Sequence, residues 1–211
     1  MSGLFVTFEG GEACGKSTQV RRLALRLGKL GRQVLAVHEP GFTEIGLAIR
    51  DLLLNAAAGK SMCRETELLL FAASRAQLVR EKIRPALDKG FIVLSDRFYD
   101  STVVYQGIGR GLDLKFIDAL NEFVAEGCRP DRTILLDLDV TVSRERQLRR
   151  VRPVGQPDRI ELLSDAFFEK VRCGYLELAL AEPDRVKMVD ASGSEDQVAE
   201  SIWSEINGFL S

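Results

Sequence analysis

Five short apolar runs recur along the chain, and stretches with the spacing of amphipathic helices separate them. Short apolar runs bounded by glycine or polar residues are typical of buried strands, whereas apolar positions three and four apart indicate helices. The first strand is expected from Leu4 up to the glycine at Gly10, and the others at 33–37, 91–95, 133–138 and 185–189. This alternation predicts an α/β fold, a five-stranded parallel sheet flanked by helices.

The helical periodicity also indicates how the chain is divided. Between the helices expected at 140–150 and 164–181, prolines, a glycine and arginines crowd a segment that cannot pack as a core element. No internal repeat, low-complexity tract or linker divides the chain, so we expect one domain over residues 1–211. The predicted helices are 18–30, 44–54, 65–88, 101–106, 114–126, 140–150, 164–181 and 195–210.

Composition limits the possible classes of partner. The 211 residues are 45% hydrophobic and 28% charged, as in an ordinary soluble globular protein. A formal net charge of −2 implies no general attraction to nucleic acid or membrane, and no apolar run approaches the length of a membrane span. No signal peptide is recognisable before the first strand. The four cysteines form no C-x-x-C pair, so we expect neither a metal cluster nor a disulfide framework. The expected location of the protein is therefore a reducing cytoplasm.

The loop after the first strand fits the pattern G-x-x-x-x-G-K-[ST], with Gly10, Gly15, Lys16 and Ser17 in the fixed positions. The glycines let the backbone approach a ligand, and the loop's N–H groups form a cradle for phosphate. Lys16 can reach the β- and γ-phosphates of a nucleotide, and the Ser17 hydroxyl can coordinate Mg²⁺. The flanking strand and helix argue against a chance match. The predicted ATP-binding residues are Gly10, Gly11, Glu12, Ala13, Cys14, Gly15, Lys16, Ser17 and Thr18.

Asp96 and Arg97 directly follow the apolar run at 91–95. Ligands of parallel sheets bind at the carboxyl ends of the strands, where P-loop proteins place the acid that organises Mg²⁺. Asp96 is therefore predicted to help hold the metal, the alternative being a cap for the next helix. Arg97 can bind phosphate oxygens in a bidentate way. The alternative role for Arg97 is a surface salt bridge, which is less expected beside a phosphate cradle.

Two further groups of residues are open to more than one interpretation. Phe71 and Arg75 share one face of the helix at 65–88 and could bind a flat base, but taken alone they favour core packing with a solvated arginine. The arginines around 144–159 could form a solvated helix end or belong to a mobile lid at about 149–160 that closes over a transferring phosphoryl group. The prolines and glycine of that segment favour the lid.

The stretch Asp96–Gly107, DRFYDSTVVYQG, resembles the signature D-R-[FYH]-x-x-S-x-x-A-Y-Q-G of the thymidylate kinase family. Supporting matches are Glu39-Pro40-Gly41 with Thr43, Arg50–Leu54, Phe71–Arg75 and Asp158–Glu161, so the resemblance covers nearly the whole chain. It implies a P-loop NTPase fold, a homodimer, and transfer of the γ-phosphoryl group of ATP to dTMP with Mg²⁺ as cofactor.

The resemblance also implies roles for individual residues. Phe71 would stack on thymine and Arg75 would bond the base, which reverses the interpretation from the residues alone. Ala13 stands where some family members carry a catalytic arginine, so the chain resembles the bacterial kind that supplies it from the lid. The implied catalytic residues are Lys16, Arg97, Arg149, Arg150 and Arg152, and the metal ligands Ser17 and Asp96. The implied dTMP-binding residues are Glu12, Glu39, Arg50, Phe71, Arg75, Arg97, Thr102, Tyr105 and Gln106.

Some positions depart from the family pattern. His38 replaces the usual arginine before Glu-Pro-Gly, and Phe42 replaces the usual second glycine, so both could reshape the acceptor side. The lid also looks longer than in familiar members, which leaves open which of its arginines reaches the phosphates. Two other functions are compatible with a P-loop: a kinase for another nucleoside monophosphate or a deoxynucleoside, and a P-loop switch. The base-binding pair disfavours the first, and separate arginines for donor and acceptor disfavour the second.

Overall fold

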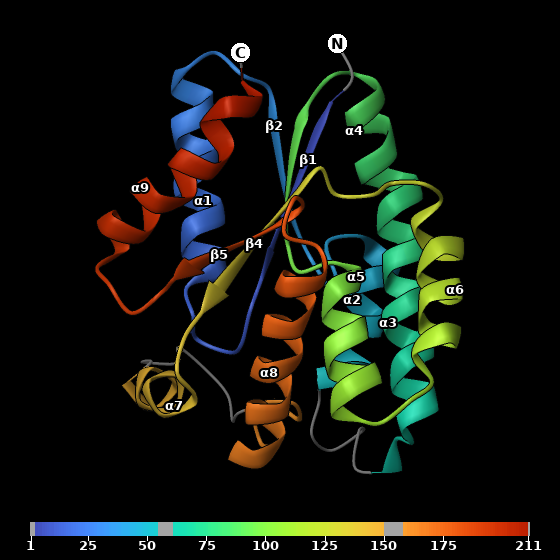
Figure 1. Cartoon of the computed structure of the whole chain (residues 1–211). Coiled ribbons are helices and arrows are strands. Elements are labelled where there is room, and N and C mark those ends of the chain that lie inside the picture. Colours follow the sequence, from blue (N-terminus) through green and yellow to red (C-terminus); the bar gives the residue numbers. More distant parts are fainter. Residues whose placement is uncertain (1–2, 55–60, 150–157, 211) are drawn as a thin grey trace.

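The computed structural model describes residues 3–54, 61–149 and 158–210 (Figure 1). Its five strands form one sheet in the order β2-β3-β1-β4-β5, and every neighbouring pair is parallel. The predicted five-stranded parallel sheet is therefore confirmed. The strands are β1 Leu4–Glu9, β2 Val34–His38, β3 Ile92–Asp96, β4 Arg132–Asp137 and β5 Val186–Asp190.

Helices cover both faces of this sheet. On one side α1 and α9 pack together, and most other helices lie on the opposite side (Figure 1). No helix of the described residues is long and apolar enough to cross a membrane. The α-helices are α1 Lys16–Lys29, α2 Glu44–Leu54, α3 Arg64–Leu78, α4 Arg84–Asp88, α5 Tyr99–Thr102, α6 Leu114–Ala125, α7 Val140–Arg149, α8 Asp165–Ala181 and α9 Glu195–Ile206.

The central strand β1 shows why the sheet is buried on both faces. Successive side chains of a strand point to opposite faces, and here both faces are apolar. Val6 and Phe8 belong to the core under α1 and α9, whereas Phe5 packs on the other face, 4.9 Å edge-to-face from Phe98. Thr7, a buried polar residue on that face, shares a 2.8 Å hydrogen bond with Thr133 of β4.

The prediction of one helix over 65–88 is wrong in one detail, because this segment is not α-helical throughout. A π-helical segment, η2 Val79–Ile83, separates α3 from α4. Pro85 lies in the first turn of α4 and has no N–H group to donate to the carbonyl four residues earlier, so the hydrogen-bonding pattern changes just before it.

The end of the helix predicted at 101–106 is also wrong, because helical structure extends to Gly109. The segment η3 Val103–Gly109 continues α5 as a π-helix. Its glycines serve close packing: a Cβ atom on Gly107 would lie 2.4 Å from Leu114, and one on Gly109 would lie 2.8 Å from the ring of Phe167. The segment therefore packs tightly against α6 and α8, with no room for side chains at these two positions.

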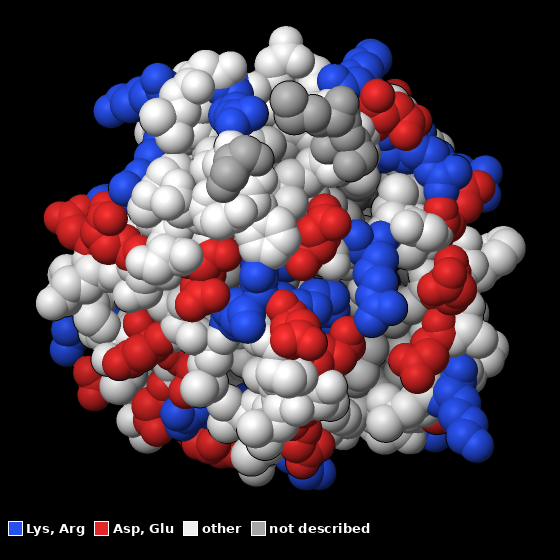
Figure 2. Space-filling view, turned by 45° about the horizontal axis from the view of Figure 1, so that its top comes forward, with Lys and Arg blue, Asp and Glu red and all other residues white. Residues whose placement is uncertain are grey.

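Basic and acidic side chains are interspersed over the end of the molecule that carries the two termini (Figure 2). Charges also pair across elements, as Arg22 and Arg26 of α1 do with acidic residues of α9. Opposite charges close together cancel much of each other's field. This face therefore presents no extended surface of a single sign.

Candidate active site

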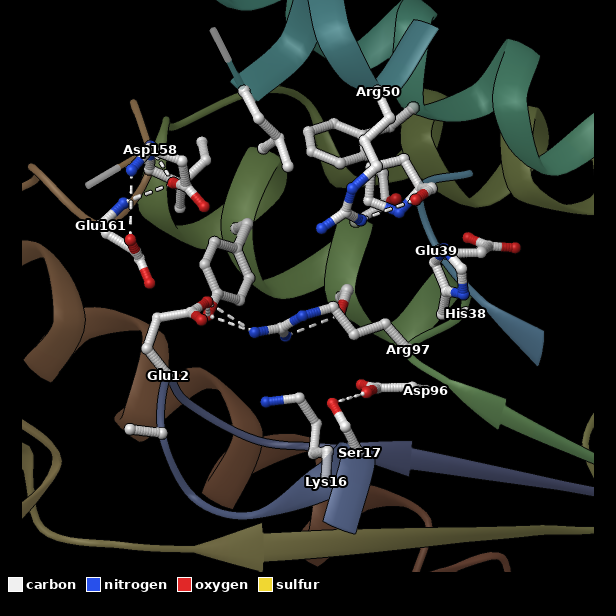
Figure 3. Close-up of a pocket in the computed structure, with 18 of the residues that line it drawn as sticks. Glu12, Lys16, Ser17, His38, Glu39, Arg50, Asp96, Arg97, Asp158 and Glu161 are labelled. Atoms are coloured by element: carbon white, nitrogen blue, oxygen red, sulfur yellow. Dashed lines mark hydrogen bonds and ion pairs between the residues drawn. The ribbon is translucent and has the colours of Figure 1, made fainter. Parts of the chain in front are cut away.

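A cavity of about 280 Å³ opens at the carboxyl ends of β1, β2 and β3. It gathers side chains from the P-loop, from the ends of β2 and β3, from α2 and α3, and from residues 158–161 (Figure 3). The lining residues that sequence predicted are Glu12, Ala13, Gly15, Lys16, Ser17, Glu39, Arg50, Phe71, Asp96, Arg97, Thr102, Tyr105 and Gln106.

The P-loop has the backbone that its glycines allow. Gly10 has φ 133° and Gly15 has φ 99°, and a Cβ atom on Gly10 would lie 2.4 Å from the carbonyl oxygen of Leu136. Lys16 is buried, and its ammonium group donates to the carbonyl oxygens of Gly10 and Gly11 at 3.2 and 2.6 Å. The predicted phosphate-binding lysine therefore lies inside the loop that would hold the phosphates.

Ser17 and Asp96 meet at the edge of the same loop. The Ser17 hydroxyl donates a hydrogen bond to the Asp96 carboxylate, although 79 residues separate them. A hydroxyl and a carboxylate oxygen side by side are hard oxygen donors of the kind that Mg²⁺ prefers. The described residues hold no cluster of three or more His, Cys, Asp or Glu side chains suited to a metal. The pair thus fits a magnesium ion that takes most of its ligands from substrate and water.

Arg97 crosses the middle of the cavity, above Lys16 and Ser17 and below Arg50 in the view of Figure 3. Its backbone is left-handed, with φ 72°, which turns the side chain out of line with β3. The Nη2 atom lies 2.6 Å from a carboxylate oxygen of Glu12 and 3.2 Å from the Tyr105 hydroxyl. Burial alone would lower the pKa of Arg97, but Tyr105 and Glu12 raise it well above its ordinary value. The guanidinium is therefore a permanent positive charge.

Behind Arg97 lies a carboxylate that the sequence analysis missed. Glu9 ends β1, is fully buried, and accepts hydrogen bonds from the Phe98 N–H, the Ser101 hydroxyl and the Tyr175 hydroxyl. Burial, and then the charge of Asp100, raise the pKa of Glu9. The sequence did offer a signal for this residue, namely an acidic side chain at the end of a largely apolar strand. A buried acid is costly unless it is hydrogen-bonded, so such a position indicates a polar network around it.

At the other end of the cavity, Phe71 lines the wall and Arg75 lies behind it. Arg75 is 1% exposed, so the interpretation as a solvated arginine is wrong. Its Nε donates to Glu39 at 2.9 Å and its Nη1 to Thr102 at 2.9 Å. Further bonds reach Asn121 and the Phe98 carbonyl. Its contact with a base stays a prediction, and Thr102 is the cavity-lining residue that it orients.

Glu39 and Arg50 occupy the wall beside His38. Burial raises the pKa of Glu39 to about 7, although Arg75 opposes the shift. Arg50 donates to the Pro40 carbonyl at 2.8 Å, with its guanidinium near the cavity. Burial and the charge of Arg50 lower the pKa of His38. Imidazole is therefore expected to be neutral at pH 7, a weaker phosphate partner than the arginine that is usual in this position.

Phe42, the second residue that departs from the family pattern, lies edge-on to His38, with 5.7 Å between the ring centroids. Its φ of 70° explains why glycine is usual there, because a side chain seldom adopts this conformation. Phe42 packs against the core below the site, so its ring fills space that glycine would leave.

Of the lid predicted at about 149–160, residues 149 and 158–160 belong to the described part of the chain. Arg149 ends α7, is largely exposed, and lies 3.4 Å from Glu145. Arg150 and Arg152 lie outside the described residues. Arg159 does not point to the phosphate end: it lies 2.6 Å from Glu67 and donates to the Leu53 carbonyl.

Comparisons with known proteins agree with this geometry. A family model described as "Thymidylate kinase" matches residues 8–202. A thymidylate kinase from Syntrophotalea carbinolica is 49% identical over 98% of this chain and 96% of its own length. One from Deinococcus radiodurans is 44% identical over 97% of each. Among solved structures, thymidylate kinase from Ehrlichia chaffeensis superposes with a TM-score of 0.79 at 28% identity, covering 98% of this chain and 100% of that one.

Proposed function

This chain belongs to the thymidylate kinase family and is a nucleoside monophosphate kinase, and we propose that its cavity transfers the γ-phosphoryl group of ATP to dTMP, giving dTDP and ADP. One observation carries the proposal: a single cavity joins the P-loop to a second set of cationic and aromatic groups, with Arg97 between the two. A nucleotide switch needs only the first set.

The donor end binds the phosphates of ATP. The P-loop N–H groups and Lys16 supply positive charge, and we expect phosphate oxygens to take over the lysine contacts now made by the carbonyls of Gly10 and Gly11. Ser17 and Asp96 would hold Mg²⁺, which neutralises charge on the phosphates when it is bound. Both side chains already face each other, so little rearrangement is needed.

The acceptor end holds a group that is already an anion, so proton removal is a minor problem and positioning and charge neutralisation carry the catalysis. We assign the dTMP phosphate to Arg50 and Arg97, which face the cavity from α2 and from the end of β3. In the protein alone Arg97 is paired with Glu12, so the phosphate must compete with that carboxylate. Arg149, Arg150 and Arg152 are proposed to add charge from the lid.

The base and sugar are assigned to the far wall of the cavity. Phe71 offers an aromatic face for stacking, and Arg75 orients Thr102, whose hydroxyl proton can still be donated to a base oxygen. Tyr105 and Gln106 line the space between the base and the phosphate groups, and Gln106 is fixed by a 2.9 Å bond to Glu67.

The test is a panel of acceptors. We would measure ADP release from ATP and Mg²⁺ with dTMP, dUMP, dGMP, dCMP, AMP or thymidine as separate acceptors. Strong preference for dTMP is expected, because the cavity offers an aromatic wall, a hydroxyl and a phosphate-binding arginine pair together. Preference for another monophosphate would contradict the acceptor assignment, and ADP release without any acceptor would favour a switch.

We also propose a homodimer in a reducing cytoplasm. Exposed apolar side chains lie on three helices that pack side by side: Ile45 and Leu52 of α2, Leu69 of α3, and Phe116 and Phe123 of α6. Such surface usually marks a protein interface. All four cysteines are free thiols, which supports a reducing compartment.

A further inference from the structure

The carboxylate behind Arg97 has a geometry that goes beyond structural support. Glu9 accepts from the Phe98 N–H at 2.7 Å through one oxygen, Oε1. Its other oxygen, Oε2, accepts from the Ser101 hydroxyl at 2.6 Å and from the Tyr175 hydroxyl at 2.7 Å. A fully buried carboxylate is costly unless both oxygens are hydrogen-bonded, and here both are.

The same two hydroxyls face Arg97. Its Nη1 atom lies 3.2 Å from the Ser101 oxygen and 3.4 Å from the Tyr175 oxygen, and it also donates to the Gly10 carbonyl at 3.0 Å. A hydroxyl has one proton to donate and lone pairs with which to accept. Because both protons can point to the same oxygen of Glu9, the lone pairs of both hydroxyls are left for Arg97.

Glu9 also acts on the backbone next to Arg97. The left-handed conformation of Arg97 is unfavourable for a non-glycine residue, so its neighbours must hold it. The Phe98 N–H is bonded to Glu9, and the Phe98 carbonyl is bonded to Arg75. The Phe98 nitrogen, which belongs to the peptide group after Arg97, is thereby held by Glu9, and the Phe98 carbonyl is held by Arg75.

We propose that Glu9 is a positioning residue for Arg97. Through Ser101 and Tyr175 it fixes the Nη1 side of the guanidinium, so that the Nη2 side faces the cavity, where Glu12 now accepts from it. This inference rests on the proposed role of Arg97 as a phosphate ligand. It assigns to Tyr175, which comes from α8 and is far away in sequence, a part in aligning the acceptor phosphate.

A matched control variant can distinguish a purely structural role of Glu9 from a role in positioning Arg97. Thr7 lies two residues earlier in β1, is equally buried, and shares a 2.8 Å hydrogen bond with Thr133 that does not involve Arg97. Thr7→Val removes one buried hydrogen bond of the same strand. It should lower the melting temperature without a specific effect on the chemical step.

The experiment compares the wild type with Glu9→Gln, Tyr175→Phe, their double variant and Thr7→Val. An amide offers only one acceptor oxygen, so at least one of the three donors to Glu9 loses its partner. We expect kcat to fall by about 10- to 100-fold in Glu9→Gln, with a KM for ATP that stays within about 3-fold. The double variant should lose little more kcat than Glu9→Gln alone, because both changes interrupt one network.

Nuclear magnetic resonance of the Arg97 guanidinium gives a readout that needs no acceptor. With its Nη1 side held, rotation of the group is slow and separate proton signals are expected in the wild type and in Thr7→Val. The exchange between these signals should become faster in Glu9→Gln and Tyr175→Phe, because the Gly10 carbonyl is then the main remaining partner of Nη1. Unchanged Arg97 signals, or an unchanged kcat, in a folded Glu9→Gln variant would overturn the inference. A wild type inactive on dTMP would contradict the proposed function instead, while the resonance test would still decide the positioning.

Discussion

At the scale of single residues, Arg97 lies between two acids, with Glu9 behind it and Glu12 beside it. Its guanidinium keeps its positive charge, and its Nη2 side can exchange Glu12 for a phosphate. Glu12 thus neutralises the charge of Arg97 in the protein alone, and the acceptor phosphate would neutralise it during turnover. Such an exchange avoids leaving Arg97 as an unpaired buried cation at either stage.

From this arrangement we predict that Arg97→Ala lowers kcat by about 10²- to 10³-fold, since it removes a charged donor directed at the transferring group. Arg97→Lys should recover only part of the loss, because an ammonium group cannot make bidentate contacts. Steady-state kinetics with dTMP would measure both. Arg22→Ala is the control, since that arginine only joins α1 to α9 at the surface. Near-normal turnover in a folded Arg97→Ala variant would rule out the role.

Glu39 predicts a pH dependence of stability. Its pKa is about 7 in the folded protein against 4.5 for the free group, because burial disfavours the charged form. The folded state therefore binds the proton of the Glu39 carboxyl group more tightly than the unfolded state does. The free energy of unfolding should fall by about 3 kcal/mol as the pH rises from about 4.5 to about 7. Glu39→Gln should show a shallower decline of stability over this pH range, because it lacks the contribution of Glu39. Urea midpoints at pH 5, 6, 7 and 8 would test the difference, and parallel profiles for the two proteins would contradict it.

At the scale of elements, the periodicity of apolar residues was sufficient to predict the sheet, because each strand is short, apolar and bounded by glycine or polar residues. The two π-helical segments were not predicted. Their cause lies in tertiary packing and in single residues such as Pro85 and Gly109, which an average over a helical window does not resolve. Local sequence shows that a helix exists more reliably than it shows how that helix is hydrogen-bonded.

One interaction between elements carries a stability prediction. Arg185, just before β5, is bonded to Asp100 of α5 at 2.7 and 2.9 Å, and both side chains are largely buried. Removing one partner leaves the other as an unpaired buried charge, so Arg185→Ala should cost about 3–5 kcal/mol. Arg129→Ala, which removes a surface pair with Glu182, should cost less than about 1 kcal/mol. Equal losses of unfolding free energy in the two variants would contradict this distinction.

At the scale of the whole molecule, the site could be predicted only where a motif carries it. The P-loop residues are contiguous in sequence, and so are those after β3, so both sets can be predicted without knowledge of the fold. Glu9 and Tyr175 are 166 residues apart, and only the packing of α8 on the sheet brings them together. Arg75 was predicted as a residue of the site, but its burial behind the wall depends on Glu39 and Thr102 from other elements.

Assembly is the last property of the whole molecule that the surface predicts. Phe123 is 74% exposed on α6, and α3, which packs against α6, and α2, which packs against α3, also carry exposed apolar side chains. Exposure of this kind costs free energy in water, and a second copy of the chain would remove it. We expect sedimentation to show a dimer for the wild type and a monomer for Phe123→Glu. Leu180→Glu on α8, also an exposed position, should stay dimeric. A monomeric wild type, or dissociation by the α8 change alone, would place the interface elsewhere or exclude it.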